Sequence, residues 1–257
     1  MRRFGSKTVI ITGASRGIGR AIAVELSCSG MYDTIILVAR TEQGLVETKN
    51  MMVTDNVDVL IEVVDLENYS NIVRMVEGIK QRYKSIDTLV NVAGYANPKS
   101  LLEMDTESLE KTFRVNVMSM FVLTREVVRV MKNTGGKILN IASTSGLSPR
   151  PGWSAYAASK AAVINFSSTL SSELEEYGIK VYCLSPGRCA TELRRVLAPD
   201  EDPSTIMQPE EVAAVVSTLL GPNGDCLDGQ NIVIRRQLNS LNREASEGLK
   251  QAASSSE

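Results

Sequence analysis

The chain has 257 residues, of which 43% are apolar and 23% charged, and its formal net charge is −2. These values are typical of a globular domain and lack the basic excess with which proteins bind nucleic acid or anionic membranes. The sequence has no histidine, and its four cysteines match no zinc or Cys-x-x-Cys spacing, so we expect no metal site and reduced thiols.

Membrane and secretion signals are also missing from the pattern. No segment approaches the roughly 18 consecutive apolar residues of a membrane span. The first apolar run, residues 8–12, is too short for the core of a signal peptide. We therefore expect a cytoplasmic protein without nucleic-acid or membrane partners.

Short runs rich in β-branched residues alternate with longer amphipathic segments along most of the chain. The expected strands are 7–13, 34–40, 58–65, 86–94, 136–143, 179–187 and 230–236, and the expected helices are 17–29, 42–54, 68–84, 105–132, 154–177 and 209–220. Nearly continuous apolar strands are typical of a parallel sheet buried on both faces. The alternation predicts right-handed β-α-β units and a doubly wound, three-layer α/β sheet of seven strands.

The domain organisation follows from the same pattern. We expect one domain over residues 1–237, because no linker-like break interrupts the alternation. A polar tail follows over 238–257, which we expect to be flexible or to form a short helix over 241–252.

The first expected strand runs into the glycine-rich turn TGASRGIG, residues 12–19. Gly13, Gly17 and Gly19 permit positive φ angles and close backbone approach, and the following helix offers free N–H groups to a pyrophosphate. The turn also contains Ser15 and Ile18. The sequence predicts a dinucleotide site here, the alternative being a tight turn without a ligand.

The second expected strand ends in a basic residue, Arg40, at the position that commonly reads the adenosine ribose. Arg16, inside the glycine turn, is a second cation. Two guanidinium groups favour a 2′-phosphate through charge-assisted hydrogen bonds, and this predicts NADP(H) as cofactor. The alternative is that both arginines are solvated surface charges.

Two further strand ends fit a cofactor, although each alone is an ordinary terminus. Asp65, followed by Leu66, would accept a hydrogen bond from the adenine amino group. The segment from Asn91 through Ala93 to Gly94 closes the fourth strand with small residues along which a cofactor would lie.

A serine, a tyrosine and a lysine form the candidate catalytic group. Ser143 follows the fifth strand, and Tyr156 and Lys160 lie one helical turn apart, so their side chains share a face. In a chain without histidine, a phenol beside an ammonium is the candidate acid/base. We expect the ammonium, together with the positive ring of the oxidised cofactor, to lower the pKa of Tyr156 from its usual value near ~10. Ser143 would hold the substrate oxygen.

These motifs, together with Asn116 in FRVNVMSMF and the segment SPGRCAT, resemble the short-chain dehydrogenase/reductase family in order and spacing over residues 7–234. The resemblance implies a Rossmann-type fold with Tyr156 as the acid/base, Lys160 on the nicotinamide ribose and Ser143 on the carbonyl. It implies that Asn116 holds a water that relays protons toward Lys160. Pro186, Gly187 and Thr191 would border the nicotinamide. The family pattern is broken at Val92, Ser185 and the last strand end, residues 234–237.

The substrate is predicted only as a class. Candidate pocket residues are Tyr95, Arg150, Trp153 and Arg188. Short segments resemble a benzil-reductase and sepiapterin-reductase-like branch, which favours a ketone or dicarbonyl interconverted with a secondary alcohol. The alternatives are a 3-oxoacyl-thioester reductase, a sugar or polyol dehydrogenase, and an NADP-binding regulatory protein without turnover.

Two further hypotheses concern charge and assembly. Arg150, Arg188, Arg194 and Arg195 lie in segments that could border the pocket, so the substrate could carry a phosphate or carboxylate, the alternative being scattered surface charges. The resemblance also implies a homodimer or homotetramer.

Overall fold

The computed structural model describes residues 7–83 and 85–236. The expected tail over 238–257, with its helix over 241–252, lies outside these residues. Among the described helices, none combines the length and the apolar character needed to cross a membrane.

The predicted alternation of strands and helices is confirmed. The strands are β1 (Thr8–Thr12), β2 (Thr34–Ala39), β3 (Asp58–Val63), β4 (Thr88–Asn91), β5 (Gly136–Ile141), β6 (Ile179–Pro186) and β7 (Asn231–Ile234). The helices are α1 (Gly17–Cys28), α2 (Glu42–Met51), α3 (Tyr69–Arg82), α4 (Thr106–Phe113), α5 (Ser119–Met131), α6 (Ser154–Leu174), α7 (Glu192–Leu197) and α8 (Pro209–Leu220).

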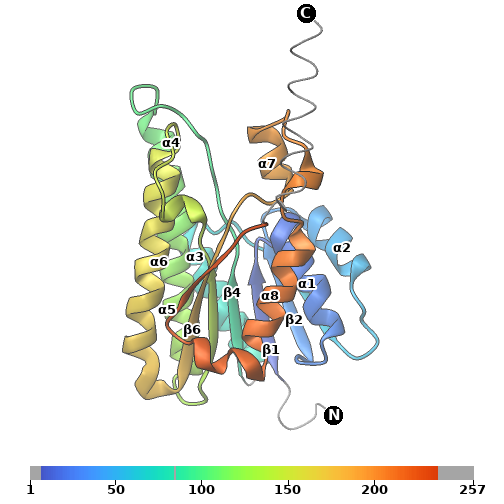
Figure 1. Cartoon of the computed structure of the whole chain (residues 1–257). Coiled ribbons are helices and arrows are strands. Elements are labelled where there is room, and N and C mark those ends of the chain that lie inside the picture. The colour runs from blue at the N-terminus through green and yellow to red at the C-terminus, as the bar shows by residue number, and fades with distance from the viewer. Residues whose placement is uncertain (1–6, 84, 237–257) are drawn as a thin grey trace, which may run out of the picture.

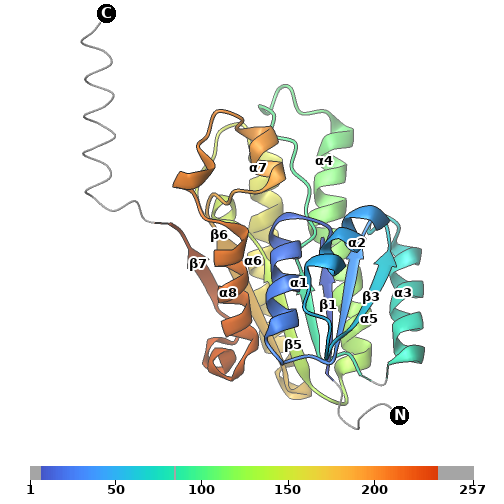
Figure 2. The same ribbon diagram turned by 90° about the vertical axis from the view of Figure 1, so that its right-hand side faces the viewer.

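The strands form one sheet in the order β3-β2-β1-β4-β5-β6-β7, and every pair is parallel. This is the predicted doubly wound, three-layer α/β fold. Helices α1, α2 and α8 cover one face, in front of the sheet in Figure 2, and α3, α5 and α6 cover the other.

The continuous apolar strands supply both hydrophobic cores. In β1, Val9 and Ile11 pack into the α1/α2/α8 layer, whereas Ile10 between them packs into the opposite layer. All three side chains are fully buried. Burying one such side chain contributes roughly 1.5–3 kcal/mol, so each strand stabilises both layers.

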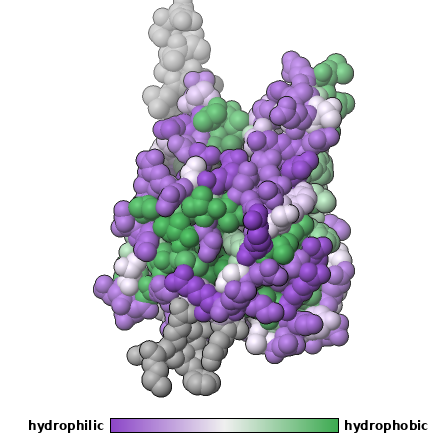
Figure 3. Space-filling view, turned by 180° about the vertical axis from the view of Figure 1, so that it is seen from behind, coloured by the Kyte–Doolittle hydropathy of each residue, from purple (hydrophilic) through white to green (hydrophobic). Residues whose placement is uncertain are grey.

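The outermost strand, β3, is less covered than the central strands. Val63 is 50% exposed, and Val53, before the strand, is 51% exposed. The view from behind, which looks onto this edge of the sheet, shows apolar residues gathered in the middle of the face (Figure 3). This edge of the sheet therefore leaves apolar surface open.

Two helical segments differ from the expectation. The predicted helix over 105–132 is interrupted by a π-helical turn, Arg114–Met118, between α4 and α5. Such turns change the direction of the side chains that follow and are frequent at functional sites. The short helix α7 was not predicted, because six residues carry too little periodicity to be recognised.

Because all strands are parallel, their carboxyl ends meet at one edge of the sheet. In Figure 1 this edge lies at the top, with α4 on one side and α7 on the other.

Candidate active site

A cleft of about 890 Å³ lies at the carboxyl edge of the sheet, within the range of about 300–1,000 Å³ typical of ligand sites. Most of the predicted site residues line it. They are Gly13, Ser15, Arg16, Gly17, Ile18, Gly19, Arg40, Asp65, Leu66, Ala93, Gly94, Tyr95, Ser143, Arg150, Trp153, Tyr156, Lys160, Pro186, Gly187, Arg188 and Thr191. The topology thus brings together segments from both halves of the chain.

The glycine-rich turn follows β1 and is shaped by two positive φ angles, 65° at Gly13 and 54° at Gly17. Gly19 is constrained by space: a Cβ atom there would lie 2.2 Å from the Gly13 carbonyl oxygen. A Cβ on Gly13 would lie 3.0 Å from the backbone of Ala93. The three glycines therefore allow the β1 turn, the start of α1 and the β4 end to pack closely, which leaves backbone exposed along the cleft.

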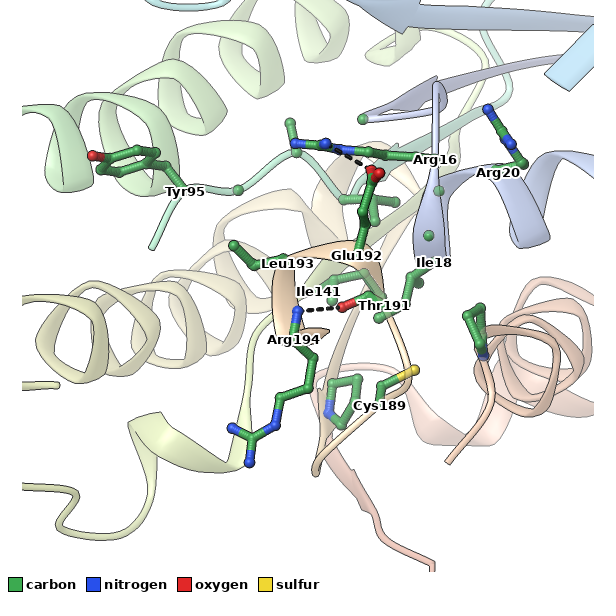
Figure 4. Close-up of a pocket in the computed structure, with 18 of the residues that line it drawn as sticks. Arg16, Ile18, Arg20, Tyr95, Ile141, Cys189, Thr191, Glu192, Leu193 and Arg194 are labelled. Atoms are coloured by element: carbon green, nitrogen blue, oxygen red, sulfur yellow. Dashed lines mark hydrogen bonds and ion pairs between the residues drawn. The ribbon is translucent and has the colours of Figure 1, made fainter. Parts of the chain in front are cut away.

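Both predicted phosphate-binding arginines have carboxylate neighbours. A guanidinium nitrogen of Arg16 lies 2.8 Å from a carboxylate oxygen of Glu192 on α7, and one of Arg40 lies 3.7 Å from a carboxylate oxygen of Glu67. Figure 4 shows Glu192 extending from α7 toward Arg16. The arginine side chains remain 63% and 58% exposed, so both are accessible from the cleft.

No feature of the sequence indicates these carboxylate partners. A glutamate at the start of α7 is ordinary for a helix N-terminus, and Glu67 lies in a turn. Only the approach of α7 to the glycine turn makes Glu192 part of the site.

Ser143, Tyr156 and Lys160 converge on one wall of the cleft. The Oγ atom of Ser143 accepts a hydrogen bond from the backbone N–H of Ser145 at 3.1 Å, and the Ser143 hydroxyl also hydrogen-bonds to Tyr156. The Nζ atom of Lys160 lies 5.8 Å from the centre of the Tyr156 ring. The rings of Trp153 and Tyr156 pack edge-on, with 5.6 Å between their centroids, so Trp153 covers part of the phenol.

Lys160 is anchored to the sheet rather than to the tyrosine oxygen. Lys160 is 3% exposed, and its Nζ donates to the backbone carbonyl of Ile141 at 2.8 Å. Burial disfavours the charged ammonium and lowers the pKa of Lys160 to about 8.

The expected direction of the Tyr156 shift is wrong for the protein alone. Burial raises the pKa of Tyr156 above its usual value, and this effect exceeds the lowering by hydrogen bonding to Ser143 and by the charge of Arg150. Lys160 does not reverse the shift, because its ammonium is directed at Ile141. The phenol is therefore held protonated, as a proton donor must be.

Two predicted asparagines are not among the residues that line the cleft. Asn91 is 3% exposed, and its Nδ2 donates to Asn140 Oδ1 at 2.8 Å and to Thr124 Oγ1 at 3.2 Å. Its amide ties β4 to β5 and α5 inside the core, while Ala93 and Gly94 beyond it face the cleft.

Asn116 lies in the π-helical turn and clamps the segment after β4. Its Oδ1 accepts from the backbone N–H of Tyr95 at 2.7 Å, and its Nδ2 donates to the Tyr95 carbonyl and to Ser159 Oγ, each at 2.9 Å. A Cβ on Gly94 would lie 3.6 Å from Asn116 Oδ1 and 3.8 Å from Lys160 Nζ. Asn116 and Lys160 thus both lie close to Gly94, and the water-relay role of Asn116 stays a prediction.

The four candidate substrate residues lie around the mouth of the site. The ammonium of Lys111 lies 5.3 Å from the centre of the Tyr95 ring. A guanidinium nitrogen of Arg188 lies 2.7 Å from a carboxylate oxygen of Glu201. No group of three or more His, Cys, Asp or Glu side chains in residues 7–83 and 85–236 is placed to hold a metal ion.

Comparison with known proteins adds to this geometry. Residues 7–202 match the family model for short chain dehydrogenases. The chain belongs to this family. It is 34% identical over 196 residues to the 3-oxoacyl-(acyl-carrier-protein) reductase of Haemophilus influenzae, covering 76% of this chain and 79% of that protein. It is 31% identical over 238 residues to the reductase of the same name from Escherichia coli, covering 89% and 96%.

Solved structures of this family share the fold. A variant of the actinorhodin polyketide ketoreductase, crystallised with NADPH, superimposes with a TM-score of 0.83 at 28% identity, over 91% of this chain and 97% of that one. Levodione reductase superimposes with the same TM-score of 0.83 at 24% identity, over the same shares of the two chains. The chain is thus an oxidoreductase of the short-chain dehydrogenase family in both sequence and fold.

Proposed function

We propose that the protein is an NADP(H)-dependent oxidoreductase that interconverts a ketone or dicarbonyl and a secondary alcohol. The observation that carries this proposal is the convergence of Ser143, Tyr156 and Lys160 in the same cleft as the glycine-rich turn. A proton donor and a dinucleotide cradle in one cavity are what carbonyl reduction requires.

The residues present fit a dinucleotide with a 2′-phosphate. Gly13 and Gly17 expose backbone along the cleft, and α1 begins there with free N–H groups that attract a pyrophosphate. Arg16 and Arg40 bring two cations near the end of β2, and Asp65 and Leu66 line the adjoining part. The ketoreductase that shares 28% identity was solved with NADPH, which supports the same preference here.

The chemistry of the chain's own residues follows from their contacts. A nicotinamide cofactor supplies or accepts the hydride. Tyr156, held protonated by burial, donates a proton to the carbonyl oxygen in the reductive direction and removes it in the reverse. Ser143, whose hydroxyl hydrogen-bonds to Tyr156 in the protein alone, would donate to the carbonyl oxygen of a bound substrate, where negative charge develops.

Lys160 and Asn116 position this group. Lys160, fixed to Ile141, would hold the nicotinamide ribose and support the phenol electrostatically. Asn116 fixes the backbone of Tyr95, which lines the cleft. Pro186, Gly187 and Thr191 border the part of the cleft assigned to the nicotinamide.

A specific test of this function is the Tyr156→Phe variant. A screen of NADPH oxidation would include diketones, quinones, 3-oxoacyl thioesters and keto sugars. We expect Tyr156→Phe to lose about 10²–10⁴-fold in kcat/KM for every accepted substrate, because the general acid is removed. Its affinity for NADPH should persist, which fluorescence titration measures. A wild-type protein that binds NADPH but reduces nothing in the screen would instead support a regulatory, non-enzymatic role.

A second candidate is a 3-oxoacyl-thioester reductase. It is favoured by the two relatives of 31% and 34% identity, which bear the name of that activity. Comparing a 3-oxoacyl thioester with a simple ketone of similar size separates the two candidates. A preference for the thioester would replace the ketone or dicarbonyl assignment while leaving the roles of Tyr156 and Ser143 intact.

We also propose assembly as a homodimer or homotetramer. Phe121 on α5 is 49% exposed and stacks on Phe166 of α6 at 4.8 Å between ring centroids. These two helices therefore present an apolar surface that a second copy of the chain would cover.

A further inference from the structure

A second cavity, of about 260 Å³, lies beside the catalytic cleft, and we call it the side pocket. Its lining comes from the loop after β5, the end of β6, the segment before α8 and the end of β7. The lining residues are Thr144, Ser148, Pro149, Arg150, Gly187, Arg188, Thr205, Ile206, Arg235 and Arg236. Four of these ten are arginines, and none is a carboxylate, so the side pocket is strongly cationic.

The side pocket adjoins the catalytic cleft and shares part of its wall. Thr144, Arg150, Gly187 and Arg188 line both cavities. Thr144 directly follows Ser143, and the charge of Arg150 reaches Tyr156, whose pKa it lowers. A group bound in the side pocket therefore lies beside the residue that follows Ser143 in the chain.

Most of the arginine charge in the side pocket has no carboxylate partner within residues 7–83 and 85–236. The side chains of Arg150 and Arg235 make no hydrogen bond or ion pair with the described part of the chain. Arg236 donates to the carbonyl oxygens of Ser204 and Ile206 at 2.6 and 3.0 Å, and no carboxylate of the described residues forms an ion pair with it.

The remaining arginine shares its partner. Arg188 lies 2.7 Å from Glu201, but Arg194 binds both carboxylate oxygens of Glu201, at 2.6 and 2.9 Å. One carboxylate thus serves two guanidinium groups. The nearby acid Asp202 turns its carboxylate to the N–H and hydroxyl of Ser204, each at 2.9 Å, and caps that turn. The side pocket keeps an excess of positive charge.

The structure refines the charge hypothesis drawn from the sequence. Of the four arginines named there, Arg150 and Arg188 line the side pocket. Arg194 is held by Glu201, and Arg195 lines neither cavity. The other two arginines that line the side pocket are Arg235 and Arg236. They follow β7, at the strand end where the sequence departs from the family pattern.

We propose that the side pocket binds an anionic group, a phosphate or carboxylate, on the carbonyl substrate itself. This inference rests on the proposed function, because it assigns the substrate class of the same site. The volume of the side pocket is below that of a typical whole-ligand site, about 300–1,000 Å³, so it takes one part of a larger ligand. Guanidinium groups match carboxylate and phosphate oxygens in a bidentate manner. The wall that the side pocket shares with the catalytic cleft favours a small keto phosphate or keto acid over a phosphate at the far end of a carrier arm.

The test compares substrates that differ only in the anionic group. Hydroxyacetone phosphate is paired with hydroxyacetone, and 4-oxopentanoate with its methyl ester, each with NADPH. We expect the anionic member of at least one pair to have the higher kcat/KM, and the pair that shows it identifies phosphate or carboxylate.

Arg235→Gln is the decisive variant, because Arg235 lines only the side pocket. It should reduce the ratio of anionic to neutral kcat/KM about tenfold or more, the effect of one lost hydrogen bond to a charged group. Arg235→Lys, which keeps the charge, should recover part of that ratio. Arg195→Gln on α7 is the matched control and should leave the ratio unchanged.

The outcomes separate this proposal from the proposed function. Reduction of neutral and anionic partners with equal efficiency, or an Arg235→Gln ratio equal to that of wild type, would overturn the side-pocket assignment while the oxidoreductase function stands. If no carbonyl compound is reduced, the proposed function fails. Calorimetric titration with glycerol phosphate and with 4-oxopentanoate then tests the side pocket alone: binding of either anion that is weakened by Arg235→Gln supports it, and binding of both that is absent or unaffected refutes it.

Discussion

Replacement of Arg16 and Arg40 by glutamine, singly and together, tests the assignment of the 2′-phosphate site. Both side chains line the cleft, and each has a carboxylate neighbour, Glu192 or Glu67. Glutamine keeps much of the length and polarity of arginine and removes the charge. We expect weaker binding of NADPH with no comparable change for NADH.

The magnitude follows from the two interactions that each arginine exchanges. A hydrogen bond from a charged group contributes about 1.5–3 kcal/mol. Release of an exposed ion pair costs about 0.2–1 kcal/mol, because the side chains of Arg16 and Glu192 are 63% and 48% exposed and solvent screens them. The net contribution is about 1–2 kcal/mol per arginine, or roughly five- to thirtyfold in the Kd of NADPH.

The assay is fluorescence titration of both cofactors into wild type and variants. Glu192→Gln serves as the internal control, since it frees Arg16. It should tighten NADPH binding by at most about fivefold and have no effect in an Arg16→Gln background. Equal losses of NADPH and NADH affinity in the arginine variants would refute the reasoning, because NADH lacks the group that the arginines are proposed to bind.

Two other predictions concern the lysine and the glycine turn. The pKa of Lys160 is lowered to about 8, so its side chain is charged below that pH. If the ammonium binds the cofactor, we expect the Kd of NADPH to be constant below pH 8. Above pH 8 the Kd should rise about tenfold per pH unit, because the ammonium loses its proton. Titrations across this range should show the rise in wild type and a flat profile in Lys160→Arg, and a flat wild-type profile would contradict the role. Gly19→Ala should destabilise the fold by about 1–3 kcal/mol, because its Cβ would meet the Gly13 carbonyl. Gly78→Ala is the control: Gly78 lies in α3, and an added Cβ would have no neighbour within 4 Å, so this variant should stabilise the fold by about 0.5–1 kcal/mol. Urea unfolding measures the free energy of unfolding of both variants. A change of the same sign in Gly19→Ala and Gly78→Ala would contradict the proposed steric role of Gly19.

Strand periodicity and glycine placement carry most of the fold and cofactor-site prediction. Runs such as residues 8–12 are buried at every position, which requires helices on both sides of the sheet. The turn over residues 12–19 needs glycine for local reasons, since φ angles and backbone clearance are set within a few residues. Such short-range constraints can be read without knowing the tertiary structure.

Side-chain direction is harder to predict in strands that are buried on both faces. Asn91 closes β4 beside the cleft residues Ala93 and Gly94, yet its amide lies in the core against Asn140. In a strand with alternating polar and apolar residues, the pattern would have shown which face of the sheet the Asn91 side chain occupies. A strand that is buried on both faces has no such alternation. The sign of the Tyr156 pKa shift was missed for a related reason, because burial around the phenol depends on packing and exceeds the effect of its neighbours.

The α/β architecture, the glycine turn and the spacing of Ser143, Tyr156 and Lys160 can be predicted from the chain alone, because each depends on local geometry or on a regular period. Which charges meet depends on how the chain folds. The tertiary structure places Glu192 against Arg16 across 176 positions of sequence, and it gathers Arg150, Arg188, Arg235 and Arg236 around one side pocket. These contacts join separate strand ends, and parallel β-α-β winding brings such ends together without leaving a pattern in the chain.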